Sequence, residues 1–263
     1  MAAGSFPDRR PYTFVALLEL TIIGVYLLAG TVDHFLRLGG LGVYALANAA
    51  LVLILALVAT KLGWWHRIGF RRASAATLVL VLPMLLPAVL NVFPGLAFPG
   101  LPETLGFLAL ALGVGFVEET AFRGLMLRAL EPRGLWRAII ITTVLFSVTH
   151  LMNILAGEGG LQAVMQLLYS AAIGFAFTAL VLRTGVIWPL IVAHALIDFV
   201  VFLRAPGAVL APTVEIAVDI AVTVVFVVFG LLVLRAGGRG RLSQGLPADP
   251  DRDASPAPAG RAD

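Results

Sequence analysis

The sequence predicts an all-α protein, a polytopic membrane bundle of about eight transmembrane helices. Hydrophobic residues make up 60% of the 263 residues and charged residues only 13%, and the mean hydropathy is +1.00. Apolar runs of about 20 residues, enough to cross ~30 Å of hydrocarbon, recur along most of the chain. This composition excludes a soluble domain.

Counting apolar runs of that length gives the expected spans in order: 14–32, 41–60, 74–93, 104–128, 138–156, 163–182, 185–203 and 213–234. The first span follows Arg9 and Arg10, as the apolar part of a signal peptide would. It is too long for that part, and no small-residue cleavage site closes it. We therefore expect a retained membrane anchor, with the two arginines acting as an orientation signal.

The spans form a single transmembrane domain, residues 1–235, and the composition then changes. Residues 236–263 are rich in Pro, Gly and Asp, which predicts a disordered tail on the cytoplasmic side. The segment 63–72, G-W-W-H-R-I-G-F-R-R, combines aromatic and basic residues, as interfacial anchors do. The chain has no cysteine, which excludes disulfides and thiolate chemistry.

The basic residues predict the orientation of the chain. With the N-terminus in the cytoplasm, the outer loops keep only Arg37 and Arg204. Tryptophans anchor at lipid headgroups, and all of them lie near the inner boundaries: Trp64, Trp65, Trp136 and Trp188. We therefore expect a plasma-membrane protein with both termini in the cytoplasm. Topology and anionic lipid account for the pI of about 9.8, so nucleic acid is not an expected partner. Lys61 is the single lysine among 18 basic residues, a bias of GC-rich bacterial genomes.

The fourth, fifth and seventh spans carry ionisable residues at membrane depth. A charge at a helix centre costs on the order of 2.5–3.5 kcal/mol on the insertion scale, so it normally faces a partner or a wet cavity. At ~1.5 Å per residue, four such residues lie about 14 to 20 Å from the cytoplasmic ends of their spans: Glu118, His150, His194 and Asp198. We expect these residues in one layer of the membrane.

The spacing of these residues suggests different roles. Glu119 and Arg123 are four residues apart on one helix face, so the guanidinium can neutralise that carboxylate. Glu118 is rotated ~100° away and has no cation on its own helix, so it is the free carboxylate. His194 and Asp198 are also four apart, which lets Asp198 hold one imidazole tautomer or contribute to the same pocket from one turn further on. A free carboxylate with two imidazoles suits the activation of water, either directly or around a metal ion.

Three motifs carry a family resemblance. In chain order they read E-E-T-A-F-R from Glu118, F-S-V-T-H from Phe146 and H-A-L-I-D from His194. Together they resemble E-E-x-x-x-R, F-x-x-x-H and H-x-x-x-N or D of the CAAX-processing and bacteriocin-processing intramembrane proteases, also called the abortive-infection family. The resemblance extends over about residues 105–203, and we take residues 104–203 as the motif-bearing core.

The resemblance implies an intramembrane endopeptidase with an eight-helix core. Glu118 and His150 would then activate the hydrolytic water, and Glu119 would lock Arg123. His194 with Asp198 would stabilise the oxyanion or complete the site, while Phe146 would pack in support. A zinc ion would be held by Glu118, His150 and His194 with an open position for water, and metal-free glutamate catalysis is the other possibility. The sequence leaves both open.

Other intramembrane residues have structural interpretations. Glu19 in the first span is expected to make a helix contact. Glu215 and Asp219 in the last span are four residues apart near the outer face, where we expect a wet rim. Close helix approach around the first motif is expected at three glycines, Gly113, Gly115 and Gly124.

Two functional classes follow. The leading hypothesis is a protease that cuts a membrane-associated peptide or protein in a cavity opening toward the cytoplasm, with lipid and the peptide as partners. The alternative is a proton-coupled transporter, or a non-proteolytic immunity or binding protein, that uses the same polar residues. A proton relay would extend across the bilayer to Glu215 and Asp219, whereas a hydrolase needs one layer. The substrate and the oligomeric state are not fixed by the sequence.

Overall fold

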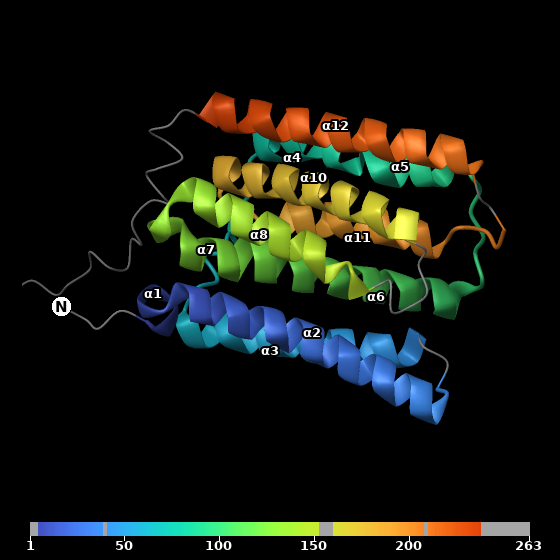
Figure 1. The fold of residues 1–263 in the computed structure, drawn as a ribbon, viewed down its shortest axis with the longest axis horizontal. Helices are drawn as coiled ribbons and strands as arrows, with labels where there is room; N and C mark the ends of the chain where they lie inside the picture. Colours follow the sequence, from blue (N-terminus) through green and yellow to red (C-terminus); the bar gives the residue numbers. More distant parts are fainter. Residues whose placement is uncertain (1–4, 39–40, 153–159, 208–209, 238–263) are drawn as a thin grey trace, which may run out of the picture.

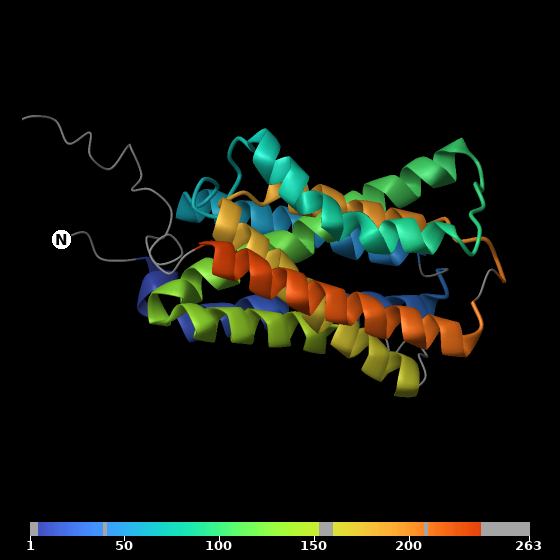
Figure 2. The same cartoon turned by 90° about the horizontal axis from the view of Figure 1, so that it is seen from above.

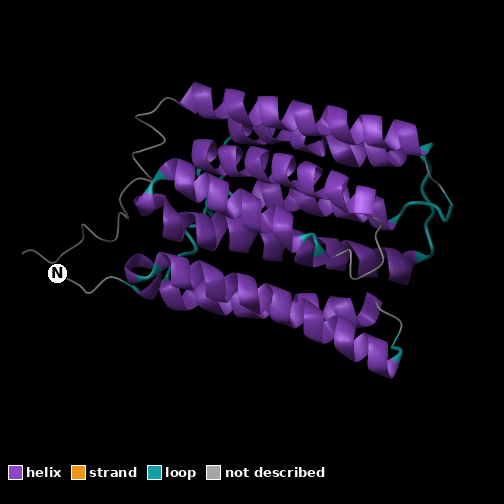
Figure 3. Cartoon of the chain, viewed as in Figure 1, coloured by secondary structure: helices purple, strands orange, loops and turns teal. Residues whose placement is uncertain are grey.

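The computed structural model describes residues 5–38, 41–152, 160–207 and 210–237. Within these ranges nearly all residues are helical, and turns and short loops connect the helices (Figure 3). The extended pairing found in the described part is a single bridge between Leu96 and Arg204. The predicted all-α membrane bundle is confirmed.

Helical segments occupy each of the expected spans. In chain order they are α2 (Pro11–Leu36), α3 (Leu41–Leu62), α4 (Ala75–Val81) continuing through η1 (Leu82–Leu85) into α5 (Leu86–Val92), α6 (Leu101–Glu118) continuing through η2 (Glu119–Met126) into α7 (Leu127–Leu130), α8 (Leu135–Thr149), α10 (Gly160–Thr184), α11 (Trp188–Phe202) and α12 (Pro212–Gly237). Two short helices complete the described set, α1 (Phe6–Arg9) and η3 (Glu131–Arg133). Six of the segments are long and apolar enough to cross a membrane, whereas α8 and α11 have 15 residues each. The count of eight crossings stays a prediction.

The motif-bearing helices lie in the middle of the bundle. Figure 1 shows α2 and α3 side by side at one edge and α12 at the opposite edge, with α6, α8, α10 and α11 between them. Helix α6 packs on α11, and α10 packs on both α8 and α12. Helices α4 and α5, which Figure 2 shows from above, pack along α11. The edge helices therefore enclose the three motifs.

Helix α2 begins and α12 ends at the same end of the bundle, here called the terminal end (Figure 1). There, Arg67 Nη1 lies 3.2 Å from the carboxylate of Asp8 in α1, and the Arg67 guanidinium stacks 3.9 Å over the ring of Trp64. The segment 63–72 thus holds the first helix in place. Helix α12 continues to Gly237, two residues into the expected tail, and residues 238–263 lie outside the described residues.

Glycines in α6 allow two neighbouring helices to come close. A Cβ atom at Gly115 would lie 2.7 Å from the carbonyl oxygen of Ile191 in α11. A Cβ atom at Gly113 would collide with Oδ1 of Asn48 in α3. The expected close approach at these two positions is therefore confirmed, and it brings α3 and α11 against the helix that carries Glu118.

Candidate active site

The first motif lies where α6 changes from an α-helix to the π-helix η2. All eight residues of η2 are buried. A π-helix is rare and often marks a functional site, because its wider turn depends on the surrounding packing rather than on local preference. Here the change begins between Glu118, the last residue of α6, and Glu119, the first of η2.

Glu119 and Arg123 form the ion pair that their spacing predicts. Arg123 Nη1 lies 3.1 Å from Glu119 Oε1, and the two side chains are 1% and 0% exposed. The Arg123 guanidinium also stacks 3.8 Å over the ring of Phe146 in α8. A Cβ atom at Gly174 of α10 would lie 2.9 Å from Arg123 Nη2 and from the Phe146 ring, so this glycine makes room for the stack. Phe146 therefore supports the site by covering the arginine.

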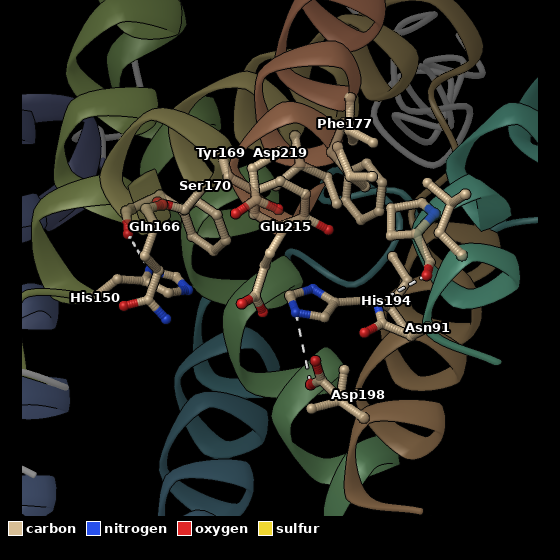
Figure 4. Close-up of a pocket in the computed structure, with 18 of the residues that line it drawn as sticks. Asn91, His150, Gln166, Tyr169, Ser170, Phe177, His194, Asp198, Glu215 and Asp219 are labelled. Carbon is tan, nitrogen blue, oxygen red and sulfur yellow. Dashed lines mark hydrogen bonds and ion pairs between the residues drawn. The ribbon is translucent and has the colours of Figure 1, made fainter. Parts of the chain in front are cut away.

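His194 lies between the two adjacent glutamates. Its Nδ1 atom is 2.8 Å from Glu119 Oε1, and this oxygen, already paired with Arg123, acts as an acceptor, so Nδ1–H donates. The Nε2 atom faces the other way, 3.5 Å from Glu118 Oε2 and 3.7 Å from Asp198 Oδ2 (Figure 4). The spacing predicts that Asp198 holds the imidazole or contributes to the same pocket; Asp198 lines the same cavities as His194, but Glu119 is the closer partner of the ring. Sequence reasoning missed this contact because 75 residues separate its ends.

His150 caps the C-terminal end of α8. Its Nδ1 atom lies 2.8 Å from the carbonyl oxygen of Phe146, which can only accept, so Nδ1 carries the proton and Nε2 is left for water or substrate. Thr149, the residue before His150, donates its hydroxyl hydrogen to Glu19 Oε1 at 2.5 Å. The expected helix contact of Glu19 is thereby confirmed, and it ties α2 to α8 next to His150.

Glu118 differs from its neighbour in its surroundings. Its side chain is 20% exposed, and Oε2 makes no hydrogen bond within the described part of the chain. An ionised carboxylate without a committed donor can accept a proton from water. Glu118 is thus the freer of the two glutamates, as the spacing predicts.

Two cavities meet at these residues. The polar cavity, about 310 Å³, lies between α5, α8, α10, α11 and α12, and the apolar cavity, about 870 Å³, is lined mainly by α2, α3 and α6. Four residues line both, His150, Gln166, His194 and Asp198. Glu215 and Asp219, expected at an outer rim, line the polar cavity and so connect that rim to the site (Figure 4).

The predicted zinc ligands are not arranged as a metal site. Among the residues that the structure describes, no group of three or more His, Cys, Asp or Glu side chains is placed to hold a metal ion. His194 donates Nδ1–H to Glu119 and turns Nε2 toward the carboxylates of Glu118 and Asp198, at 3.5 and 3.7 Å. The residues do not fit the zinc set Glu118, His150 and His194, and a metalloprotease is not supported.

The comparison with protein families agrees with the motifs. Residues 100–200 match the family described as "Type II CAAX prenyl endopeptidase Rce1-like". The predicted resemblance to the CAAX protease family is confirmed. The matched segment runs from the start of α6 into α11 and includes every predicted site residue, whereas α2, α3 and α12 lie outside it. The comparison with curated proteins gives no match. A resemblance to CAAX proteases indicates intramembrane proteolysis by a multi-pass membrane protein.

Proposed function

We propose that the protein is an intramembrane endopeptidase that uses Glu118 as general base to hydrolyse a membrane-associated peptide or protein. One observation carries this proposal. Glu118 lines the apolar cavity and its Oε2 atom makes no hydrogen bond within the described residues, while the Oε1 atom of Glu119 is committed to both Arg123 and His194. The family match supports the same reaction class.

The hydrolysis proceeds in two steps. Glu118 takes a proton from water, whose oxygen bonds to the scissile carbonyl carbon while the π electron pair moves onto the carbonyl oxygen. The carbon–nitrogen bond then breaks, the electron pair leaves with the nitrogen, and Glu118 returns the proton to the departing amine. His150 Nε2 orients the water, and His194, fixed by Glu119, presents Nε2 at the opposite side. Asp198 lies beside that nitrogen.

The apolar cavity gives the substrate a direction of entry. Its outer wall is formed by exposed residues at the adjoining ends of α2 and α3, including His34, Phe35 and Leu41, on either side of the connection between the two helices. This connection is at the end of the bundle opposite to the terminal end (Figure 1). If the termini are cytoplasmic, the cavity opens toward the outer face. The two predictions of cytoplasmic termini and of a cytoplasmic opening therefore exclude each other, and we propose the outer opening.

The same geometry supports the protease over the transporter. Toward the terminal end the core is closed by fully buried apolar residues of η2 and α7, among them Leu125, Met126 and Leu130. Glu215 and Asp219 line the polar cavity, on the side of the site away from these residues. A hydrolase needs water from one side, whereas a relay needs polar groups on both.

Glu118→Gln tests the proposal. The amide is nearly isosteric but cannot accept the proton, so cleavage of quenched peptides by the chain purified in detergent should fall by at least about 100-fold. Thermal unfolding should be unchanged, because the Glu118 side chain holds no buried partner in place. Cleavage at more than a tenth of the wild-type rate would refute the assignment of the base.

A further inference from the structure

Tyr26 and Asn48 form a polar pair on the two edge helices, outside the matched segment. Asn48 in α3 is 3% exposed, and its Nδ2 donates to the hydroxyl of Tyr26 in α2 at 3.2 Å. Both residues line the apolar cavity together with Glu118 and His194. Burying an amide within an otherwise apolar membrane span costs free energy unless the amide forms hydrogen bonds.

The orientation of this pair is fixed by α6. Because Gly113 has no Cβ, the Asn48 Oδ1 atom lies against the helix backbone, and the Nδ2 atom is left to face Tyr26. A phenol that accepts this hydrogen bond keeps one proton to donate. Within the described residues Tyr26 donates no hydrogen bond, so its proton is available to a molecule in the cavity.

The motif residues leave a need for such a donor. Oxyanion formation requires donors aimed at the carbonyl oxygen. Glu118 and Asp198 are acceptors when ionised, and Arg123 is buried beneath Phe146 and paired with Glu119. The corresponding motif position holds asparagine or aspartate, and this chain has the aspartate, which lacks the amide N–H groups.

We propose that Tyr26 donates a hydrogen bond to the carbonyl oxygen of the scissile peptide bond and supplies the donor that Asp198 lacks. Asn48 acts as the positioning residue. The inference rests on the proposed function. Tyr26 keeps its proton throughout: the bond to the carbonyl oxygen strengthens as negative charge develops there and weakens when the amine leaves.

The experiment compares purified full-length variants on one quenched peptide, the one that the wild-type chain cleaves fastest. Tyr26→Phe removes the hydroxyl and should lower kcat by about 100-fold with little change in KM, as the loss of one oxyanion donor does. Tyr12→Phe is the matched control, because Tyr12 lies on the same helix α2 but lines neither cavity, and it should cleave at the wild-type rate.

The effect of Tyr26→Phe should depend on which residue occupies position 198 if Tyr26 is a hydrogen-bond donor, and should not depend on it if Tyr26 only packs. In an Asp198→Asn background an amide donor is present, so adding Tyr26→Phe should cost less than about tenfold. Equal losses in both backgrounds, or a Tyr26→Phe variant with more than half of the wild-type kcat, would overturn the inference.

A second variant covers the case in which Tyr26→Phe does not fold. Asn48→Asp keeps Tyr26 but offers it a carboxylate acceptor, which should capture the phenol proton and lower kcat by at least about tenfold. A folded Asn48→Asp variant with wild-type kcat also overturns the inference. Failure of the proposed function looks different: the wild-type chain would then cleave no peptide, or Glu118→Gln would stay active.

Discussion

Glu119 is the residue on which the site depends most. One of its oxygens, Oε1, contacts both Arg123 at 3.1 Å and His194 at 2.8 Å, so a single carboxylate joins η2 to α11. The pair with Arg123 is fully buried, and removing one partner of such a pair leaves the other charge without compensation. Glu118, one residue earlier, is freer of such commitments.

Glu119→Gln should therefore impair folding, in contrast to Glu118→Gln. We expect a loss on the order of 3–5 kcal/mol of stability, because Arg123 remains charged and unpaired in a dry environment. Thermal unfolding in detergent, followed by loss of the monodisperse peak, measures the difference from the Glu118→Gln control. Similar melting temperatures for the two variants would contradict this division of roles.

Asp198 should tolerate conversion to asparagine. Glu119 already fixes the His194 tautomer, and Asp198 lies 3.7 Å from Nε2, so its charge is not needed to orient the ring. Asp198→Asn should keep at least about a third of the cleavage rate, Asp198→Ala should lose about tenfold, and His194→Ala nearly all activity. If Asp198→Asn were as inactive as His194→Ala, the negative charge itself would be required.

At the scale of helices, the contact between α6 and α11 sets the geometry of the site. Gly115 faces the backbone of α11 at Ile191 and Ala195, and a Cβ atom there would also lie 3.5 Å from the Cβ of His194. In membranes, small residues let helices pack closely without a hydrophobic driving force. The 2.8 Å contact from His194 to Glu119 depends on this close packing.

Gly115→Ala should push α11 away and weaken that contact. We expect a destabilisation of about 1–3 kcal/mol, typical of overpacking, and a cleavage rate at least tenfold lower. Gly106→Ala in the same helix is the control, since nothing lies within 4 Å of its added Cβ. The two variants are compared by melting temperature and kcat, and equal behaviour would show that α6 and α11 can separate without cost.

The sequence predicts the helices well because each one needs only a long apolar run, which is local information. The Glu119–Arg123 pair is local in the same sense, since four residues separate its members. The π-helical turn at Glu119 and the contact from Glu119 to His194 depend on how distant helices pack, so no spacing rule finds them. Tyr26 and Asn48 carry no motif, although Asn48 stands out as an amide within an apolar span.

For the molecule as a whole, the question is which membrane face receives the substrate. The distribution of basic residues favours cytoplasmic termini. Arg67 and Arg133 lie near α1 at the terminal end and fit this orientation. The apolar cavity runs to the opposite end. A peptide would then enter from the outer half of the membrane.

Cysteine labelling tests this orientation, because the chain has no cysteine of its own. His66→Cys is at the terminal end and Phe98→Cys at the opposite end, and both positions are exposed. In intact cells a membrane-impermeant maleimide should label Phe98→Cys, whereas His66→Cys should react only after permeabilisation. The reverse pattern would place the cavity mouth in the cytoplasm.

The contacts of Glu119 with Arg123 and His194 can form only in a fixed order during synthesis of the chain. Arg123 is synthesised only four residues after Glu119, so this pair can form as soon as the helix does. His194 emerges from the ribosome 75 residues later, and until α11 inserts, Glu118 has no imidazole from that helix beside it. On the proposed mechanism a nascent chain therefore lacks a complete site until α11 is made, and it should not cleave peptides while the earlier helices are being inserted.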